Sequence, residues 1–387
     1  MKHALSFEET LMTSLRSRIS IEKWDDAKEA YEENYYKDTI LSIIDYVGSD
    51  LRKKYGNDTN SYFKIPHGSI VVEIEITDTE LHIKVPFLEI GEKNKIPLLR
   101  KIAEVNFYPL NLSQIKLKDN HLNFHYSTPL HLCEPSKIYY VLEEICHNAD
   151  NLDDELINLF DAKLLHEPKI NFYNQDLLDS AWQKFISLLS EAEEFINYFD
   201  EKRIEYFNWD IINITLKRIE YLIAPSGKLR TDIEHQVNCL YNKEDMQIRI
   251  QRGKNFLNTL KSMSKEDFVA DMYVAETFIP IKSRSEIESI KRNWGKPFET
   301  ATKEMQNKQY TAATLTLLVA FYDLFYYNTI EDDINNQVVK VLRNADKKVW
   351  EEAATVLYKG MDGIMKNKTI AQDLTSTTKG FLSKLFK

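Results

Sequence analysis

Glycine, proline and cysteine are scarce in this chain of 387 residues. It contains ten glycines, ten prolines and three cysteines. Because glycine and proline interrupt regular elements, their scarcity, together with many Leu, Ile, Lys and Glu residues, favours a mostly helical chain. The cysteines, Cys133, Cys146 and Cys239, lie far apart and form no Cys-x-x-Cys pair. We therefore expect no disulfide framework and a reducing compartment.

Basic residues are in the minority. The chain has 50 Lys and Arg residues against 60 Asp and Glu residues, which gives a net charge of −10. Broad nucleic-acid binding needs a basic footprint, so we expect no nucleic-acid partner. Hydrophobic residues make up 43% and charged residues 28% of the chain, as in globular proteins, and the length allows two domains.

Long uninterrupted apolar runs are missing too. The most apolar stretch, residues 311–327, is short for a bilayer span and contains Asp323, so we expect a buried helix there. Residues 1–10 lack the apolar core of a signal peptide. Residues 380–387 form a basic amphipathic tail, for which docking within the chain or a frayed end is favoured over docking on a partner or contact with a membrane surface. These features predict a cytoplasmic protein.

Known catalytic and cofactor motifs do not occur. The chain contains no Gly-x-Gly-x-x-Gly, His-Glu-x-x-His or Gly-x-Ser-x-Gly pattern. Gly227-Lys228 and Gly295-Lys296 each lack the earlier glycine of a phosphate-binding loop. We therefore expect neither enzymatic activity nor a cofactor.

What the chain does have is a regular alternation of apolar residues in its first half. Residues 70–76 and 81–87 place their apolar side chains on one face, because side chains in a strand alternate with a period of two. Residues 62–65 lead into Pro66, which suits an edge strand because proline cannot donate to a central ladder. Three strands are therefore predicted before residue 90.

Helical and strand spacing then follow each other. Residues 95–105 carry a helical apolar stripe, and residues 135–160 repeat that spacing over a longer stretch. Between them, two short strands are joined by Asp119-Asn120, a turn pair that tolerates left-handed backbone. The order of helix, three strands, helix, two strands and helix predicts an α+β domain with an antiparallel sheet.

Helices are expected on both sides of this region. The spacing predicts helices at residues 7–21 and 24–54. After Pro168 no stretch resembles a strand of any length, and the pattern is that of paired amphipathic helices. We therefore predict an α+β domain at residues 1–168, with N-terminal helices, followed by an all-α domain of antiparallel helical hairpins at residues 169–387.

The element order in residues 31–160 resembles the type III secretion chaperone (Tir chaperone) family and its YbjN-like relatives. Apolar spacing carries the resemblance in four stretches, residues 96–106, 112–117, 122–126 and 135–160. Members of that family are small, acidic, cytoplasmic bacterial proteins, usually dimeric, which bind extended client segments without catalysing a reaction. The resemblance implies a protein or peptide client and a homodimer formed through the α+β domain. A secretion chaperone is normally little more than this one domain, whereas residues 273–366 of this chain are similar to a segment of longer bacterial Tir-like chaperones.

The predicted client site is an edge of the sheet. An extended peptide can add to a free strand edge, where main-chain hydrogen bonds give affinity and side-chain pockets give specificity. Alternatively, these strands pair with each other or with a second subunit. The residues proposed to receive the client are Tyr62, Phe63, Ile65, Leu81, Ile83, Val85, Phe87 and Leu88.

Three histidines offer an alternative function. His121 and His125 share one strand face, with His82 on a neighbouring strand, and imidazoles at such spacing can bind zinc. A polar, solvated strand face explains the pattern equally well, and no carboxylate is in register to complete a site. We therefore predict no metal. A metal-dependent or otherwise unrecognised enzyme stays as one alternative, and a structural scaffold assembled through the helical half as another.

Two further groups are interpreted as core. Cys146 and His147 are adjacent, and neighbouring residues on a helix diverge by about 100°, so we expect Cys146 to pack inside rather than act as a nucleophile. A dense aromatic cluster is also expected to pack in a core, with a partner-binding groove as the alternative. Its members are Phe321, Tyr322, Phe325, Tyr326 and Tyr327.

Overall fold

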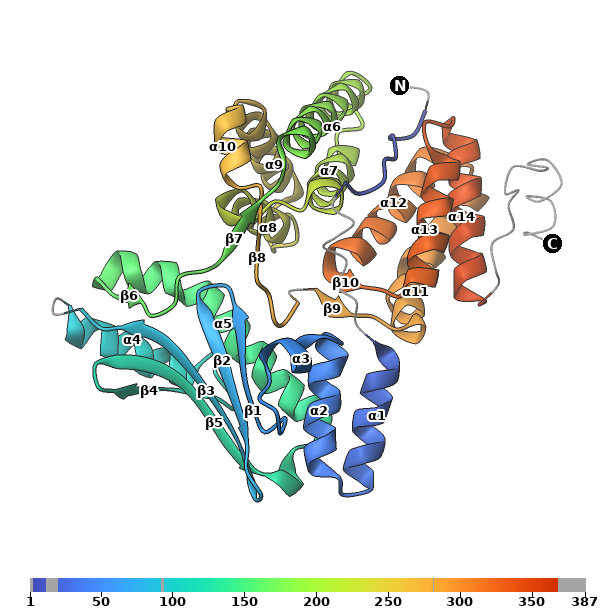
Figure 1. Cartoon of the computed structure of the whole chain (residues 1–387). Coiled ribbons are helices and arrows are strands. Elements are labelled where there is room, and N and C mark those ends of the chain that lie inside the picture. Colours follow the sequence, from blue (N-terminus) through green and yellow to red (C-terminus); the bar gives the residue numbers. More distant parts are fainter. Residues whose placement is uncertain (1–2, 12–19, 92–93, 281, 368–387) are drawn as a thin grey trace. The chain divides into compact units, whose positions relative to one another are not determined.

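The computed structural model describes residues 3–11, 20–91, 94–280 and 282–367 (Figure 1). It contains 62% helix and 15% strand, with an antiparallel sheet in the N-terminal region and helices after it, which confirms the α+β expectation at this level. The chain forms two compact units. The sheet unit comprises Ser17–Asn171 and Val274–Ile281, and the helical unit comprises Met1–Arg16, Phe172–Tyr273 and Lys282–Lys387.

Two segments belong to a different unit from the one expected from a division at Pro168. The beginning of the chain belongs to the helical unit, and Val274–Ile281 belongs to the sheet unit. Each unit has its own hydrophobic core, which is formed by buried side chains from several segments of the chain.

Among the described residues, the sheet unit holds an antiparallel sheet of six strands. The strands pair in the order β1-β2-β3-β5-β4, and β6 pairs with β3. Asp119 and Asn120, which join β4 to β5, have φ angles of 50° and 64°, the left-handed backbone predicted for this turn. The bounds are β1 (Tyr62–His67), β2 (Ile70–Ile76), β3 (Glu80–Glu89), β4 (Gln114–Lys118), β5 (His121–Pro129) and β6 (Lys163–Leu164).

The sheet buries one face and leaves the other polar. Ile74 and Ile83 are opposite each other in register on the buried face, whereas Glu73 and Lys84 form the neighbouring pair on the outer face. This follows from the period-two alternation read from the sequence. Helices cover the buried face, so the sheet has a packed side and a solvated side.

The region predicted as one helix over residues 24–54 is three helices, so that prediction is wrong. Asn34 has φ 67° and reverses the chain after the first helix, and Gly48 is extended after the second. Helical apolar spacing continued across both interruptions and hid them. The helices of the sheet unit are α1 (Ile21–Glu32), α2 (Tyr36–Val47), α3 (Leu51–Tyr55), α4 (Lys95–Phe107) and α5 (Pro135–Phe160), with a short 3-10 helix at Leu130–Leu132.

A distant segment completes the core of the sheet unit. Phe278 and Ile279 are buried among the side chains of the sheet and its helices. The backbone nitrogen of Gly68, at the β1–β2 turn, donates to the carbonyl of Glu276 at 2.8 Å. His67 accepts a hydrogen bond at Nδ1 from the backbone nitrogen of Phe278 at 3.1 Å.

The helical unit consists mainly of antiparallel helices. Strand β9 pairs in parallel with β10 within it, whereas β7 and β8, which pair with each other, each include residues of both units. The helix bounds are α6 (Gln175–Glu201), α7 (Phe207–Ile223), α8 (Gly227–Leu240), α9 (Met246–Lys261), α10 (Lys265–Ala270), α11 (Ile287–Gln306), α12 (Tyr310–Tyr327), α13 (Asp332–Ala345) and α14 (Trp350–Met365). The strands are β7 (Ile170–Phe172), β8 (Tyr273–Ala275), β9 (Ser283–Arg284) and β10 (Asn328–Thr329).

The first described residues run extended over the helical unit instead of forming the predicted helix. His3 forms a β-bridge with Val349, and Ala4 N donates to Lys348 O at 2.7 Å. Residues 7–11 of the predicted 7–21 helix are therefore not helical, and residues 12–19 lie outside the described residues. The tail at residues 380–387 also lies outside them.

The apolar stretch at residues 311–327 forms α12, whose side chains are buried in the helical unit as predicted. Among the helices that the structure describes, none combines the length and the apolar character needed to cross a bilayer.

Helices α13 and α14 are closely packed. A Cβ added at Gly360 would lie 2.4 Å from Val341 Cγ1, so a glycine is needed for this approach.

Candidate functional site

Most of the predicted client strand lies inside the sheet. Strand β3 pairs with β2 on one side, where β6 also joins it, and with β5 on the other. Its residues 81–84 and 88–89 are therefore paired on both sides, so most of the predicted receiving edge lies in the interior of the sheet. The five apolar side chains proposed there are fully buried: Leu81, Ile83, Val85, Phe87 and Leu88.

Strand β1 is an edge strand, but its own chain occupies part of that edge. Gly56 forms a β-bridge with Phe63, and Asn57 N donates to Tyr62 O at 2.9 Å. Pro66 offers no donor in the second half of the strand. The side chains of Phe63 and Ile65 are buried in the core and cannot line a client pocket. The edge thus offers no continuous row of groups to an added strand.

The opposite edge, β4, is covered by one side chain. Asn106, at the end of α4, donates from Nδ2 to Ile115 O at 2.9 Å and accepts from Ile115 N at Oδ1 at 2.7 Å. The amide therefore satisfies the outward backbone groups of Ile115, one position of this edge strand. Both edges of the sheet are thus occupied in part by the chain itself.

The candidate metal-binding histidines lie on the outer face of the sheet but do not converge. His82 Nδ1 contacts Ser127 Oγ at 2.8 Å, and His125 Nδ1 contacts Lys116 Nζ at 3.2 Å. His121 is four residues from His125 along β5, a separation of roughly 13 Å. In the described part of the chain, no group of three or more His, Cys, Asp or Glu side chains is placed to hold a metal ion.

The cysteines of the sheet unit are core residues. Cys146 is fully buried on α5, and burial raises its pKa well above the ordinary value for a thiol. Burial likewise raises the pKa of Cys133 to about 11. Both side chains are therefore neutral thiols at physiological pH, unsuited to nucleophilic chemistry.

The sheet unit exposes several large apolar side chains on and near α4 and β4, whose ribbons lie next to each other in Figure 1. Phe107 and Tyr108, at the end of α4, are 91% and 77% exposed. Together with four other exposed apolar residues they define what we call the α4–β4 surface. Its members are Ile96, Phe107, Tyr108, Leu112, Leu117 and Tyr140.

Polar contacts hold α4 and β4 side by side. Lys95 Nζ, at the start of the helix, donates to Asn120 Oδ1 in the β4–β5 turn at 2.8 Å. The Asn106–Ile115 pair joins the end of the helix to the beginning of the strand. The two elements therefore run in opposite directions along each other.

The loop between Tyr108 and β4 is fixed by a buried carboxylate. Glu144 on α5 accepts from Asn111 N at 2.6 Å, from Ser113 N at 2.9 Å and from Ser113 Oγ at 2.6 Å. Asn111 Nδ2 also donates to Tyr140 OH at 3.1 Å. The loop that follows Phe107 and Tyr108 is thus tied to α5 by hydrogen bonds at Asn111 and Ser113, which restricts its conformations.

The sequence that contributes to the α4–β4 surface is locally basic, although Lys101 forms an ion pair with Glu155 and Lys116 contacts His125 on the outer face of the sheet. Residues 95–118 contain five basic residues and a single acidic one, Glu104, in a chain whose net charge is −10. Opposite charge on a partner speeds association and fixes register. The basic residues are Lys95, Arg100, Lys101, Lys116 and Lys118.

The helical unit contains a buried polar cluster that the sequence analysis missed. Lys217 on α7 is 0% exposed, forms an ion pair with Asp323 on α12 and donates to Tyr241 OH at 2.9 Å. Its ammonium lies 4.8 to 5.6 Å from the ring centres of Tyr241, Tyr326 and Tyr327. Burial lowers the pKa of Lys217, and Asp323 opposes that change. The ion pair and rings join α7, the end of α8 and α12.

The predicted aromatic cluster on α12 has two parts, one in the hydrophobic core and one around the ammonium of Lys217. Phe321, Tyr322 and Phe325 are buried in the helical core, whereas Tyr326 and Tyr327 face the Lys217 ammonium. Asp323 breaks the apolar run because it pairs with that lysine, which is the physical reason for a charge in the middle of a buried helix.

Comparisons of the chain with known protein families, with curated proteins and with solved structures give no match.

Part of the α4–β4 surface has a signal in the sequence. A helix must end before Pro109, which places the aromatic residues Phe107 and Tyr108 at a helix end. No apolar segment of the neighbouring sequence is expected to cover them there, so they are exposed. The anchoring role of Glu144 has no such signal, because it joins residues 31 or more positions apart.

Proposed function

We propose that this protein is a non-catalytic, chaperone-like protein-binding module whose α4–β4 surface takes an apolar segment of a partner protein that also carries acidic residues. The observation that carries the proposal is the exposure of Phe107 and Tyr108 before a loop held by Glu144. Large apolar side chains exposed to solvent are typical of protein interfaces, and aromatic residues dominate binding energy at their centres.

The chemistry of the surface favours side-chain contacts over strand addition. Both sheet edges are occupied by local contacts, at Gly56–Phe63 and at Asn106–Ile115. A bound segment therefore gains affinity by burying apolar area against Phe107 and its neighbours. The surrounding lysines and arginine favour acidic residues in the segment, so binding weakens as salt rises.

The family resemblance supports the same class of function. The element order from α2 to α5 is the order that resembles the type III secretion chaperones, which hold client segments without catalysis. We extend that class to this chain as part of the proposal, with cytoplasmic localisation and an absence of catalysis following from it.

The proposal is tested with two short fluorescein-labelled peptides that have Leu and Phe at the same positions. The acidic peptide has Asp and Glu between these positions, and the basic peptide has Lys there. Fluorescence anisotropy of the full-length protein should detect the acidic peptide and not the basic one, with weaker binding at high salt. The double variant F107S/Y108S should weaken binding at least about tenfold.

The matched control is I248S, which removes an exposed apolar side chain from α9 in the helical unit and should leave binding unchanged. Equal binding of both peptides, or no loss in F107S/Y108S, would contradict the proposal. A self-associating wild type that F107S/Y108S renders monomeric would show instead that a second copy of the chain covers this surface.

A further inference from the structure

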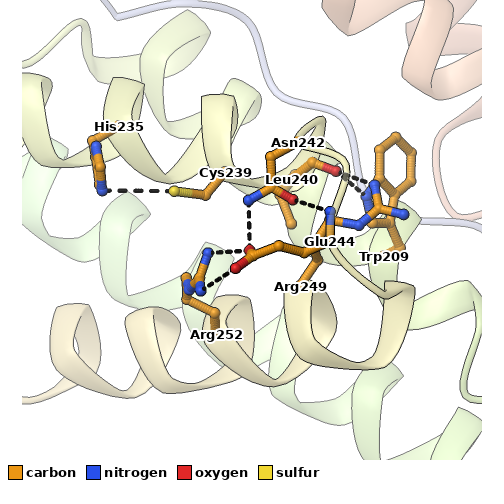
Figure 2. Close-up of polar contacts among 8 residues, drawn as sticks. All are labelled: Trp209, His235, Cys239, Leu240, Asn242, Glu244, Arg249 and Arg252. Carbon is orange, nitrogen blue, oxygen red and sulfur yellow. Dashed lines mark hydrogen bonds and ion pairs between the residues drawn. The ribbon is translucent and has the colours of Figure 1, made fainter.

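Cys239, in the last turn of α8, lies among groups that can activate a thiol. Its Sγ is 3.6 Å from Nε2 of His235, one helical turn earlier, and the guanidinium of Arg252 on α9, which is hydrogen-bonded to Glu244, is a neighbouring cation. Figure 2 shows the sulfur directed toward the imidazole, with the guanidinium of Arg252 below it. The site is a nucleophile with a base and a cation beside it.

We propose that Cys239 is a modification site, a thiol that small hydroperoxides oxidise to sulfenic acid with His235 carrying the proton. Reactive cysteines are partly exposed and lie next to positive groups, whereas structural cysteines are buried and inert. Cys239 is half-exposed, while Cys133 and Cys146 are buried. One chain thus contains both kinds, which gives an internal comparison.

The reaction balances with the peroxide as the only co-reactant. The thiol proton passes to His235, and the sulfur attacks one peroxide oxygen, so that an S–O bond forms as the O–O bond breaks. Sulfur is oxidised and the peroxide is reduced. His235 returns the proton to the leaving hydroxide or alkoxide, which departs as water or alcohol.

Oxidation at this position reaches the turn that joins α8 to α9. Arg252 forms two hydrogen bonds with Glu244, at 2.7 and 3.2 Å, and the Leu240 carbonyl accepts from Trp209 Nε1 at 2.9 Å and from Arg249 Nη1 at 2.6 Å (Figure 2). A sulfenic oxygen on Cys239 competes with Glu244 for the guanidinium. The modification therefore loosens the contact between Arg252 and the α8–α9 turn.

The test measures the alkylation of each cysteine by iodoacetamide in the folded, full-length protein, by peptide mass spectrometry. Cys239 should react at least about tenfold faster than Cys133 and Cys146. The variant H235Q should lower the Cys239 rate at pH 7 about threefold to tenfold and leave the rate at pH 9.5 unchanged. The control E234Q, on the same helix, should keep the wild-type rate.

A second measurement uses hydrogen peroxide followed by dimedone, which traps sulfenic acid. The adduct should form on Cys239 in the wild type and be absent in C239S, and H235Q should slow its formation. An unchanged Cys239 rate in H235Q, or no dimedone adduct on Cys239 in the wild type, would overturn the proposal.

Discussion

The carboxylate of Glu144 accepts both hydrogen-bonding groups of Ser113, the backbone nitrogen at 2.9 Å and the hydroxyl at 2.6 Å. Replacing Glu144 with Ala leaves these donors and Asn111 N without their acceptor inside the sheet unit. We expect E144A to lower the free energy of unfolding by about 2–4 kcal/mol, because bonds to a buried charged group contribute most. Urea denaturation measures this, and limited proteolysis should show cleavage within residues 107–113.

The control for this prediction is E143A, one position earlier on α5. Glu143 accepts none of the loop hydrogen bonds that Glu144 makes, so its removal should change the unfolding free energy by less than about 0.5 kcal/mol. A loop that stays protected from protease in E144A would show that packing, and not the carboxylate, fixes the 107–113 conformation.

His67 links the β1–β2 turn to the segment that returns from the distant part of the sequence. Its Nε2 contacts Asp150 Oδ2 at 3.1 Å, and its Nδ1 accepts from Phe278 N, also at 3.1 Å. The variant H67F orphans the Phe278 N–H in the core and should cost about 1–3 kcal/mol of stability. Hydrogen exchange should increase at residues 276–279. The exposed H131A serves as control, and unchanged exchange in H67F would refute the role.

Helices and strands were predictable from the sequence where a single apolar periodicity corresponds to a single element. They were not predictable where the chain reverses direction while the apolar periodicity continues. Residues 70–76 and 135–160 were predicted correctly because their alternation matches a single element. Asn34 splits a continuous helical pattern by adopting φ 67°, which composition does not reveal. Residues 7–11 carry helical spacing but run extended, because their partners lie more than 200 positions away, as in the hydrogen bond from Leu11 N to Leu222 O.

The site was less predictable than the fold. Strand pairing order cannot be read from alternation, so β3 was taken for an edge although three strands pair with it. The Lys217–Asp323 pair joins residues 106 positions apart, and a single sequence carries no signal of such a contact. The hydrogen bonds of Asn106 to the β4 edge are equally unpredictable from the sequence, since asparagine is a common residue near a helix end.

Asp210 on α7 makes the stability of the helical unit depend on pH. Burial raises its pKa to about 7, and Glu304 adds to the rise. The folded state keeps this proton while the unfolded chain releases it above its ordinary pKa of 3.8, so stability falls as pH rises from about 4 to 7. The loss is about 4 kcal/mol at most. The variant D210N should remove most of this slope in thermal unfolding.

The exposed Glu205, near the start of α7, provides the control for this pH dependence. E205Q should keep the wild-type pH profile, whereas D210N should be the more stable protein at pH 8. Identical profiles for the wild type and D210N would mean that the Asp210 carboxyl is hydrated in the folded state.

The Lys217–Asp323 pair should respond unequally to the loss of each partner, because the two groups are unequally buried. Lys217 has no exposed side-chain surface, whereas 36% of the Asp323 side chain is exposed. D323N leaves a buried ammonium without its counter-charge and should cost about 3–5 kcal/mol, even though three tyrosine rings still surround it. K217M leaves a carboxylate that water can reach, and an apolar stem in place of the lysine stem, so it should cost only about 1–2 kcal/mol. The double variant K217M/D323N should then be close to K217M and more stable than D323N, because K217M removes the buried charge that makes D323N costly.

Urea denaturation of all three variants measures the cycle, with the exposed pair Lys228–Asp232 as a reference expected to contribute less than about 0.5 kcal/mol. Equal costs for D323N and K217M would show that water also reaches Lys217, and the cage of Tyr241, Tyr326 and Tyr327 would then be open in solution.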